Sequence, residues 1–140
     1  MNKVAGYDLD GVLVSDAFWD KETIRLRRLL KPLFIPESDF VIITGRPVED
    51  NVGALAYWVK SSFNTNIKHL YCANADWKKA AEYKASVLLT HPEIYIYFES
   101  DPEQVKIISA LVSTPIFLWS DFLKAKVNEF TKQFIVGEHK

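Results

Sequence analysis

Short apolar runs alternate with longer amphipathic stretches along most of the chain. The apolar runs are bounded by turn residues and predict five strands, at residues 3–9, 39–44, 67–72, 93–98 and 115–119. The other stretches predict helices at residues 20–34, 47–63, 75–91, 102–112 and 121–133, and the first is expected to stop at Pro32. Strands that alternate with helices form right-handed crossover units on a parallel sheet. We therefore expect a three-layer α/β/α, Rossmann-like fold around a five-stranded parallel sheet.

The composition is typical of a single folded domain, which we expect to span residues 1–140. Hydrophobic residues make up 49% of the chain and aromatic residues 14%, which is enough to build a buried core. The formal net charge is -1. The chain as a whole therefore has no field that would attract nucleic acid or a membrane surface, although a local basic patch is left open.

The sequence contains a single cysteine, Cys72. One cysteine rules out an internal disulfide framework and is typical of proteins in a reducing compartment. No apolar run approaches the length of a membrane span, and the first predicted strand begins too early to leave room for a signal peptide. We therefore expect a cytoplasmic protein.

Polar residues gather where three of the predicted strands end. They are Asp8, Asp10 and Gly11 at the end of the first strand, Thr44, Gly45 and Arg46 at the end of the second, and Glu99, Ser100 and Asp101 at the end of the fourth. The carboxyl ends of parallel strands meet at one edge of the sheet, where ligands of such folds bind. Four carboxylates that converge there cannot all stay ionised without a positive partner, and a hard divalent cation together with a lysine is the natural one.

This ordered set resembles the haloacid dehalogenase (HAD) superfamily of phosphotransferases. The first family motif, an apolar strand followed by Asp-x-Asp-Gly, is matched by YDLDGVLV, and the second, a strand ending in Thr or Ser, by FVIITGRP. The third, a helix lysine, is best matched by Lys84 in EYKASVL, and the fourth, an acidic pair after a strand, by IYFESDP. Asp-x-Asp-Gly alone is more typical of a turn. The four motifs in order, over residues 4–102, favour a phosphate site on a HAD-like fold.

The resemblance implies a catalytic role for four residues. Asp8 would be the nucleophile that forms an aspartyl phosphate, and Asp10 the general acid and then the general base. Thr44 would donate a hydrogen bond to a phosphoryl oxygen, and Lys84 would balance the charges of nucleophile and phosphate. The remaining residues expected to bind phosphate or substrate are Gly11, Gly45 and Arg46. Arg46 is equally well explained as a partner of the nearby acids.

The resemblance also implies a Mg²⁺ cofactor, held by Asp8 and the Asp10 carbonyl together with an acid from the fourth motif. The family often has adjacent acids there, whereas Ser100 separates Glu99 from Asp101 in this sequence. The sequence therefore leaves open which of these two acids contacts the metal. Lys78 and Lys79 compete with Lys84 for the lysine role. We prefer Lys84 because its apolar setting predicts that it points inward.

The gaps between the motifs are too short to hold the cap domain that many family members have. An open site favours a bulky phosphorylated substrate, such as a nucleic-acid end, a phosphoprotein or a large carbohydrate, or a partner subunit that acts as a lid. The expected function is therefore Mg²⁺-dependent phosphatase activity. The main alternative is a non-catalytic module of the same fold that binds phosphate or a protein. A receiver-type signalling domain is disfavoured, because the third strand ends without an acid.

Overall fold

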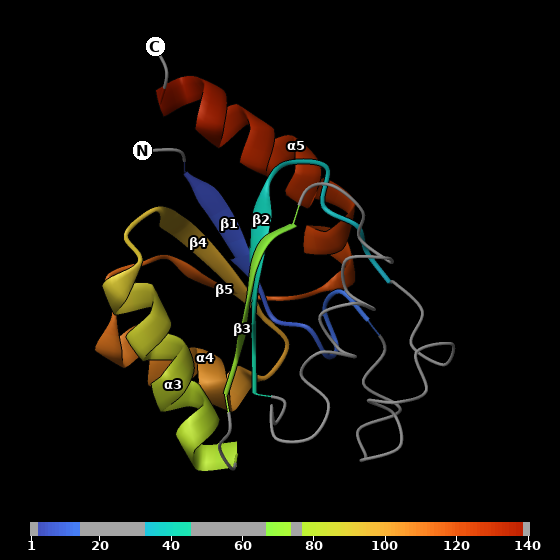
Figure 1. The fold of residues 1–140 in the computed structure, drawn as a ribbon. Coiled ribbons are helices and arrows are strands. Elements are labelled where there is room, and N and C mark those ends of the chain that lie inside the picture. Colours follow the sequence, from blue (N-terminus) through green and yellow to red (C-terminus); the bar gives the residue numbers. More distant parts are fainter. Residues whose placement is uncertain (1–2, 15–32, 46–66, 74–76, 139–140) are drawn as a thin grey trace.

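The computed structural model describes residues 3–14, 33–45, 67–73 and 77–138. Within them lie five strands: β1 (Val4–Tyr7), β2 (Phe40–Thr44), β3 (Ile67–Cys72), β4 (Ile94–Glu99) and β5 (Ile116–Leu118). Three helices, α3 (Trp77–Thr90), α4 (Pro102–Leu111) and α5 (Asp121–Glu138), complete the described part (Figure 1). The predicted helix at 47–63 lies outside the described residues. So does the helix predicted at 20–34, except for residues 33 and 34, which are not helical.

The five strands form one parallel sheet in the order β3-β2-β1-β4-β5. The α/β class and the five-stranded parallel sheet are therefore confirmed. Strand order reverses between β1 and β4, because the chain first adds strands on one side of β1 and then crosses to the other. Ligands of open α/β sheets bind at such a reversal, outside the carboxyl ends of the strands.

Main-chain hydrogen bonds between neighbouring strands continue one residue beyond the strand ends. They hold the carboxyl ends of these strands side by side. The Asp8 N–H donates to the Phe98 carbonyl at 2.9 Å, and the Trp119 N–H donates to the Glu99 carbonyl at 2.8 Å. On the other side of β1, the Ala73 N–H donates to the Thr44 carbonyl at 2.9 Å. The residues predicted to form the site therefore leave the sheet along one common edge.

The three central strands are buried along their whole length, whereas the edge strands β3 and β5 are more exposed. Strands buried on both faces are typical of parallel sheets and explain why β1, β2 and β4 are almost continuously apolar. Successive side chains point to opposite faces and enter two separate clusters of buried residues.

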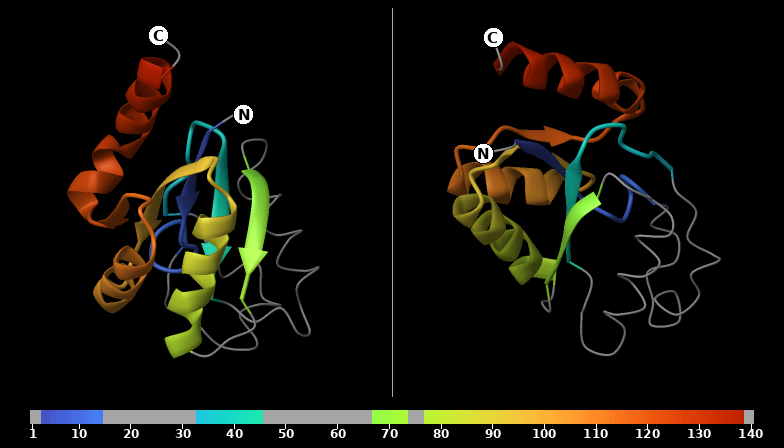
Figure 2. Two further views of the ribbon diagram at one scale, coloured as in Figure 1. Left: turned by 90° about the vertical axis from the view of Figure 1, so that its left-hand side faces the viewer. Right: turned by 45° about the horizontal axis from the view of Figure 1, so that its top comes forward.

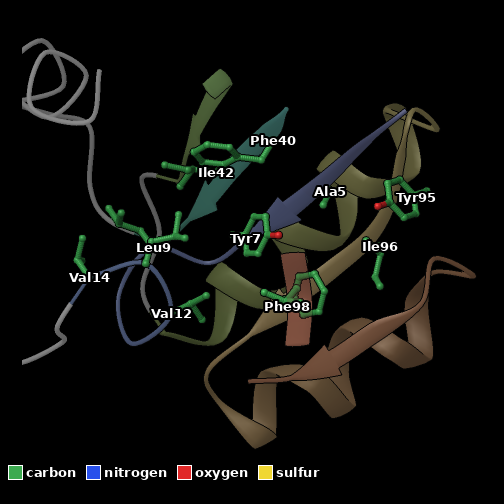
Figure 3. Packing of buried hydrophobic residues seen from close by; sticks show 12 residues of the cluster. Ala5, Tyr7, Leu9, Val12, Val14, Phe40, Ile42, Tyr95, Ile96 and Phe98 are labelled. Carbon is green, nitrogen blue, oxygen red and sulfur yellow. The ribbon is translucent and has the colours of Figure 1, made fainter. Parts of the chain in front are cut away.

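The first cluster contains most of the aromatic side chains of the central strands, with Tyr7 in the middle (Figure 3). The Tyr7 ring is stacked on Phe98, with 5.0 Å between ring centroids, and meets the edge of Phe40 at 5.7 Å. Val127 of α5 is fully buried in this cluster. The α5 helix is thus fixed by an apolar contact with the same side chains that pack the strands.

The second cluster lies under α3 and α4, and Figure 2 shows α5 set apart from these two helices. Its members are Val4, Val41, Ile43, Ala81, Ala85, Val87, Leu88, Ile94, Tyr97 and Ile108. The small side chains Ala81 and Ala85 allow α3 to approach the sheet closely. Among the described residues, no helix is long and apolar enough to span a lipid bilayer.

We expect Ile108→Ala on α4 to lower the free energy of unfolding by about 2–4 kcal/mol, because the substitution leaves a cavity in the second cluster. Ile108 is fully buried, whereas its neighbour Ile107 is 39% exposed. The matched control Ile107→Ala should therefore cost less than about 1 kcal/mol. Urea unfolding of both variants measures the difference. Equal losses would contradict the packing of α4 described here.

Candidate functional site

The loop that follows β1 is a tight turn with an apolar underside. The Leu9 carbonyl accepts hydrogen bonds from the N–H groups of Leu13 and Val14, both at 3.0 Å, and the Gly11 N–H donates to Val14 at 2.7 Å. Gly11 has a φ of 83°, a main-chain conformation that residues with a Cβ atom rarely adopt. Leu9, Leu13 and Val14 are fully buried and fix the loop to the core.

This turn changes one expectation from the sequence. The first strand was expected to cover residues 3–9 and therefore to include Asp8 and Leu9. In the structure β1 ends at Tyr7, and Asp10 lies inside the turn. The physical reason is the Leu9 carbonyl, which accepts hydrogen bonds from within the turn instead of continuing the ladder of the sheet.

Asp8 is a nearly buried carboxylate with donors on both of its oxygens. The Leu9 N–H donates to Oδ1 at 2.9 Å, and the Lys84 ammonium donates to the same oxygen at 3.3 Å. The Ser100 hydroxyl donates to Oδ2 at 2.9 Å. These donors come from three different parts of the chain, so the orientation of the carboxylate depends on the complete fold.

Lys84 lies on α3 and places its ammonium between Asp8 and Glu99. Its side chain is 2% exposed, and Nζ is 2.8 Å from Glu99 Oε1. Burial lowers the pKa of Lys84, but the attraction and the hydrogen bonds of Asp8 and Glu99 outweigh burial and raise it overall. Lys84 therefore points inward as expected, whereas Lys79 is exposed and the Lys78 side chain lies outside the described part.

Glu99 ends β4 and is fully buried, with two donors on each carboxylate oxygen. Oε1 accepts from Lys84 at 2.8 Å and from the Tyr97 hydroxyl at 3.0 Å. Oε2 accepts from the main-chain N–H groups of Ser100 and Asp101, at 3.1 and 3.2 Å. A cation could contact Glu99 only by displacing one of these donors, so the structure places Glu99 as the anchor of Lys84.

Burial and the nearby Asp8 charge raise the pKa of Glu99 to about 8, although Lys84 acts in the opposite direction. The charge balance of the buried group agrees with the direction of this shift. Asp8 and Glu99 together have two negative charges when ionised, and the Lys84 ammonium compensates one. A proton on Glu99, or a cation nearby, compensates the other.

Asp101 is the N-cap residue of α4, and its hydrogen bonds differ from those of Glu99. Its Oδ1 caps the helix by accepting from the Glu103 N–H at 3.2 Å, with Pro102 in the first turn. Its Oδ2 is buried, and no group in the described part of the chain donates a hydrogen bond to it. A buried carboxylate oxygen requires a compensating partner. Of the two acids left open by the sequence, Asp101 is thus the one with an oxygen available to a cation.

Thr44 and Gly45 leave the sheet at the same edge. Thr44 ends β2 and is 1% exposed. A Cβ atom on Gly45 would lie 3.0 Å from the Ala80 Cβ, so any other residue here would require α3 to move slightly away from the main chain. Arg46 lies outside the described residues.

The available ligands for a cation are all oxygens, as Mg²⁺ requires. Asp8 Oδ2 and the Asp10 carbonyl converge on the Ser100 hydroxyl, and Asp101 has a buried oxygen without a donor. Among the described residues, no three His, Cys, Asp or Glu side chains lie close enough together to hold a metal by themselves. Asp8 Oδ2 and the Asp10 carbonyl would suit a magnesium ion that keeps several of its waters, as this ion usually does.

Two contributors to the site were not assigned from the sequence. Ser100 was noted only as the residue that separates two acids, although its position at a strand end was a signal. Tyr97 lies within the fourth predicted strand and was not assigned to the site. Its hydroxyl lies 3.0 Å from Glu99 Oε1 and 3.2 Å from the Ile43 carbonyl, and no sequence pattern distinguishes this tyrosine from other buried ones.

The chain matches no protein-family model, no curated protein and no solved structure.

We expect Lys84→Met to lower the free energy of unfolding by about 3–5 kcal/mol, because it leaves two buried carboxylates without their cation. The control Lys79→Met changes an exposed lysine on the same helix and should stay within about 0.5 kcal/mol of the wild type. Urea unfolding of the three proteins in EDTA measures both effects. A Lys84→Met protein as stable as the control would contradict the ion pairs assigned to Lys84.

We expect the stability of the metal-free protein to fall as the pH rises from about 5 to about 8. The folded-state pKa of Glu99, about 8, exceeds the ordinary value of 4.5, so in this range the folded protein keeps a proton that the unfolded chain releases. The contribution is complete below pH 4.5 and is lost by about 1.4 kcal/mol per pH unit at most. Glu99→Gln should remove this slope. Urea unfolding of both proteins across this pH range measures the slope. Parallel curves of unfolding free energy against pH would contradict the raised pKa of Glu99.

Proposed function

We propose that the protein is a HAD-type phosphohydrolase that cleaves phosphate monoesters through an aspartyl phosphate on Asp8. The observation that supports this best is the Asp8 carboxylate, buried at the strand-order reversal and held by Lys84 on one oxygen and Ser100 on the other. A carboxylate that only ended a turn would need neither the buried lysine nor the separate glutamate that holds this lysine in place. The ordered HAD motifs of the sequence give the reaction class.

The proposed reaction has two steps. In the first, an Asp8 carboxylate oxygen forms a bond to phosphorus while the bond to the leaving oxygen breaks, and the Asp10 carboxyl group gives its proton to that oxygen. In the second, the Asp10 carboxylate takes a proton from water as the water oxygen attacks phosphorus. The bond between Asp8 and phosphorus then breaks, which releases inorganic phosphate and restores both acids.

The other residues would hold the phosphate and balance its charge. The Thr44 hydroxyl and the Gly45 N–H would donate to phosphoryl oxygens at the end of β2, and Arg46 would contact the substrate. The Lys84 ammonium would compensate the negative charges of Asp8 and of the bound phosphate. A bound Mg²⁺ would supply further positive charge for the phosphate. Asp8, the Asp10 carbonyl and Asp101 would hold it, and Glu99 would support it indirectly through Lys84.

We further propose that the fold is the three-layer HAD-like arrangement without a cap, as the short gaps between motifs predict. An uncapped site takes a phosphate displayed on a large molecule, such as a nucleic-acid end, a phosphoprotein or a carbohydrate, or is closed by a partner. Hydrolysis of these substrate classes, compared side by side with Mg²⁺ present, would identify the class. Phosphate binding without turnover of any of them would favour the non-catalytic module.

We expect Asp8→Asn to abolish Mg²⁺-dependent hydrolysis of an aryl phosphate, with kcat reduced by about a thousandfold or more. The amide keeps the shape of the side chain but is a poor nucleophile. Asp39→Asn is the matched control, since Asp39 lies on the surface in an ion pair with Lys68. The control should keep wild-type kcat. Turnover that survives in Asp8→Asn would exclude Asp8 as the nucleophile.

A further inference from the structure

The Ser100 hydroxyl lies between two oxygen atoms of the loop that follows β1. Its Oγ is 2.9 Å from Asp8 Oδ2 and 3.0 Å from the Asp10 main-chain carbonyl oxygen. A hydroxyl group has one proton, so it donates to one of these acceptors at a time while both oxygens face it. The carboxylate of Asp8 and the carbonyl of Asp10 therefore already converge on one point.

Two oxygens that face the same point repel each other unless a proton or a positive charge lies between them. A carboxylate and a main-chain carbonyl are also the ligands that a hard divalent cation prefers. In this protein the Ser100 proton takes the place that such a charge would take. The side chains next to Ser100 in the sequence do not lie between these two oxygens. Glu99 accepts a hydrogen bond from Lys84, and Asp101 caps α4.

We propose that the Ser100 hydroxyl is a placeholder for the cation. In the metal-free protein its proton holds Asp8 and the Asp10 carbonyl together, and a cation that binds these two oxygens must displace it. Ser100 is then a positioning residue that keeps the site assembled and at the same time weakens its affinity for the ion. This inference rests on the proposed function for the identity of the cation, Mg²⁺.

A serine that acts as a placeholder affects cation binding in a way that a purely structural serine would not. A hydrogen bond that exists only in the metal-free state stabilises this state alone, so breaking it is part of the free energy of cation binding. Removing the hydroxyl destabilises the metal-free protein and leaves the loaded protein less affected. The cation must then bind more tightly, although a side chain of the site has been lost.

The experiment compares Ser100→Ala with the wild type by calorimetric titration with Mg²⁺ and by thermal unfolding in EDTA. We expect Ser100→Ala to bind Mg²⁺ about tenfold more tightly, the change that corresponds to one hydrogen bond of ordinary net strength. Its unfolding midpoint in EDTA should be lower than that of the wild type, and saturating Mg²⁺ should narrow this difference. Unchanged or weaker Mg²⁺ binding in Ser100→Ala would overturn the proposal.

Two further variants separate the hydroxyl from other effects of the substitution. Ser100→Thr keeps a hydroxyl and should keep wild-type affinity, and tightening in this variant too would overturn the proposal. Ser86→Ala removes an exposed hydroxyl on α3, which is bonded to the Tyr83 carbonyl, and should leave Mg²⁺ binding unchanged. Tighter binding in this control would likewise count against a specific role of Ser100.

The outcomes also distinguish the placeholder from the proposed function. If the wild type binds Mg²⁺ and hydrolyses phosphate esters but Ser100→Ala does not bind more tightly, the placeholder alone fails. If neither protein binds Mg²⁺, the magnesium dependence of the proposed function fails together with the placeholder. If binding is measurable only in Ser100→Ala, the placeholder is supported.

Discussion

A lysine buried between two carboxylates is the constraint on which the arrangement of the site depends. An ammonium group taken out of water is tolerated only when it is paired and hydrogen-bonded. Glu99 can be its fixed partner because three further donors hold the glutamate in place. Lys84 is then positioned to reach Asp8 as well. Helix α3 and strands β1 and β4 must all be in position before this group of charges exists.

The order of the strands explains why residues from distant parts of the sequence meet here. Strands β1 and β4 are neighbours only because the chain crosses over β1 after completing β2 and β3. The loop after β1 and the start of α4 therefore lie next to each other, so that Ser100 can reach both Asp8 and Asp10. Tyr97 adds a link to β2 through the Ile43 carbonyl. Three adjacent strands thus contribute to one hydrogen-bonded group.

The sequence predicted the features that depend on local pattern. All five strands, the helices α3, α4 and α5, and the inward direction of Lys84 follow from apolar periodicity and caps, and the structure agrees with them. The roles of Glu99 and Asp101 could not be separated in this way, because they depend on which donors reach each oxygen. The turn after Asp8 was missed for a similar reason, since its hydrogen bonds depend on the Leu9 carbonyl. Strand order, which joins these parts, is a property of the whole fold and has no local signal.

The mutual dependence of Lys84 and Glu99 restricts how this protein can change over evolutionary time. Loss of Lys84 leaves both carboxylates without their cation, and loss of Glu99 leaves Lys84 with Asp8 alone, so each single step destabilises the folded protein. An apolar pair would pack in the same space, but reaching it requires two simultaneous changes. We therefore expect the two positions to change together. Ser100 is neutral and only partly buried, so a change at this position leaves no buried charge without a partner.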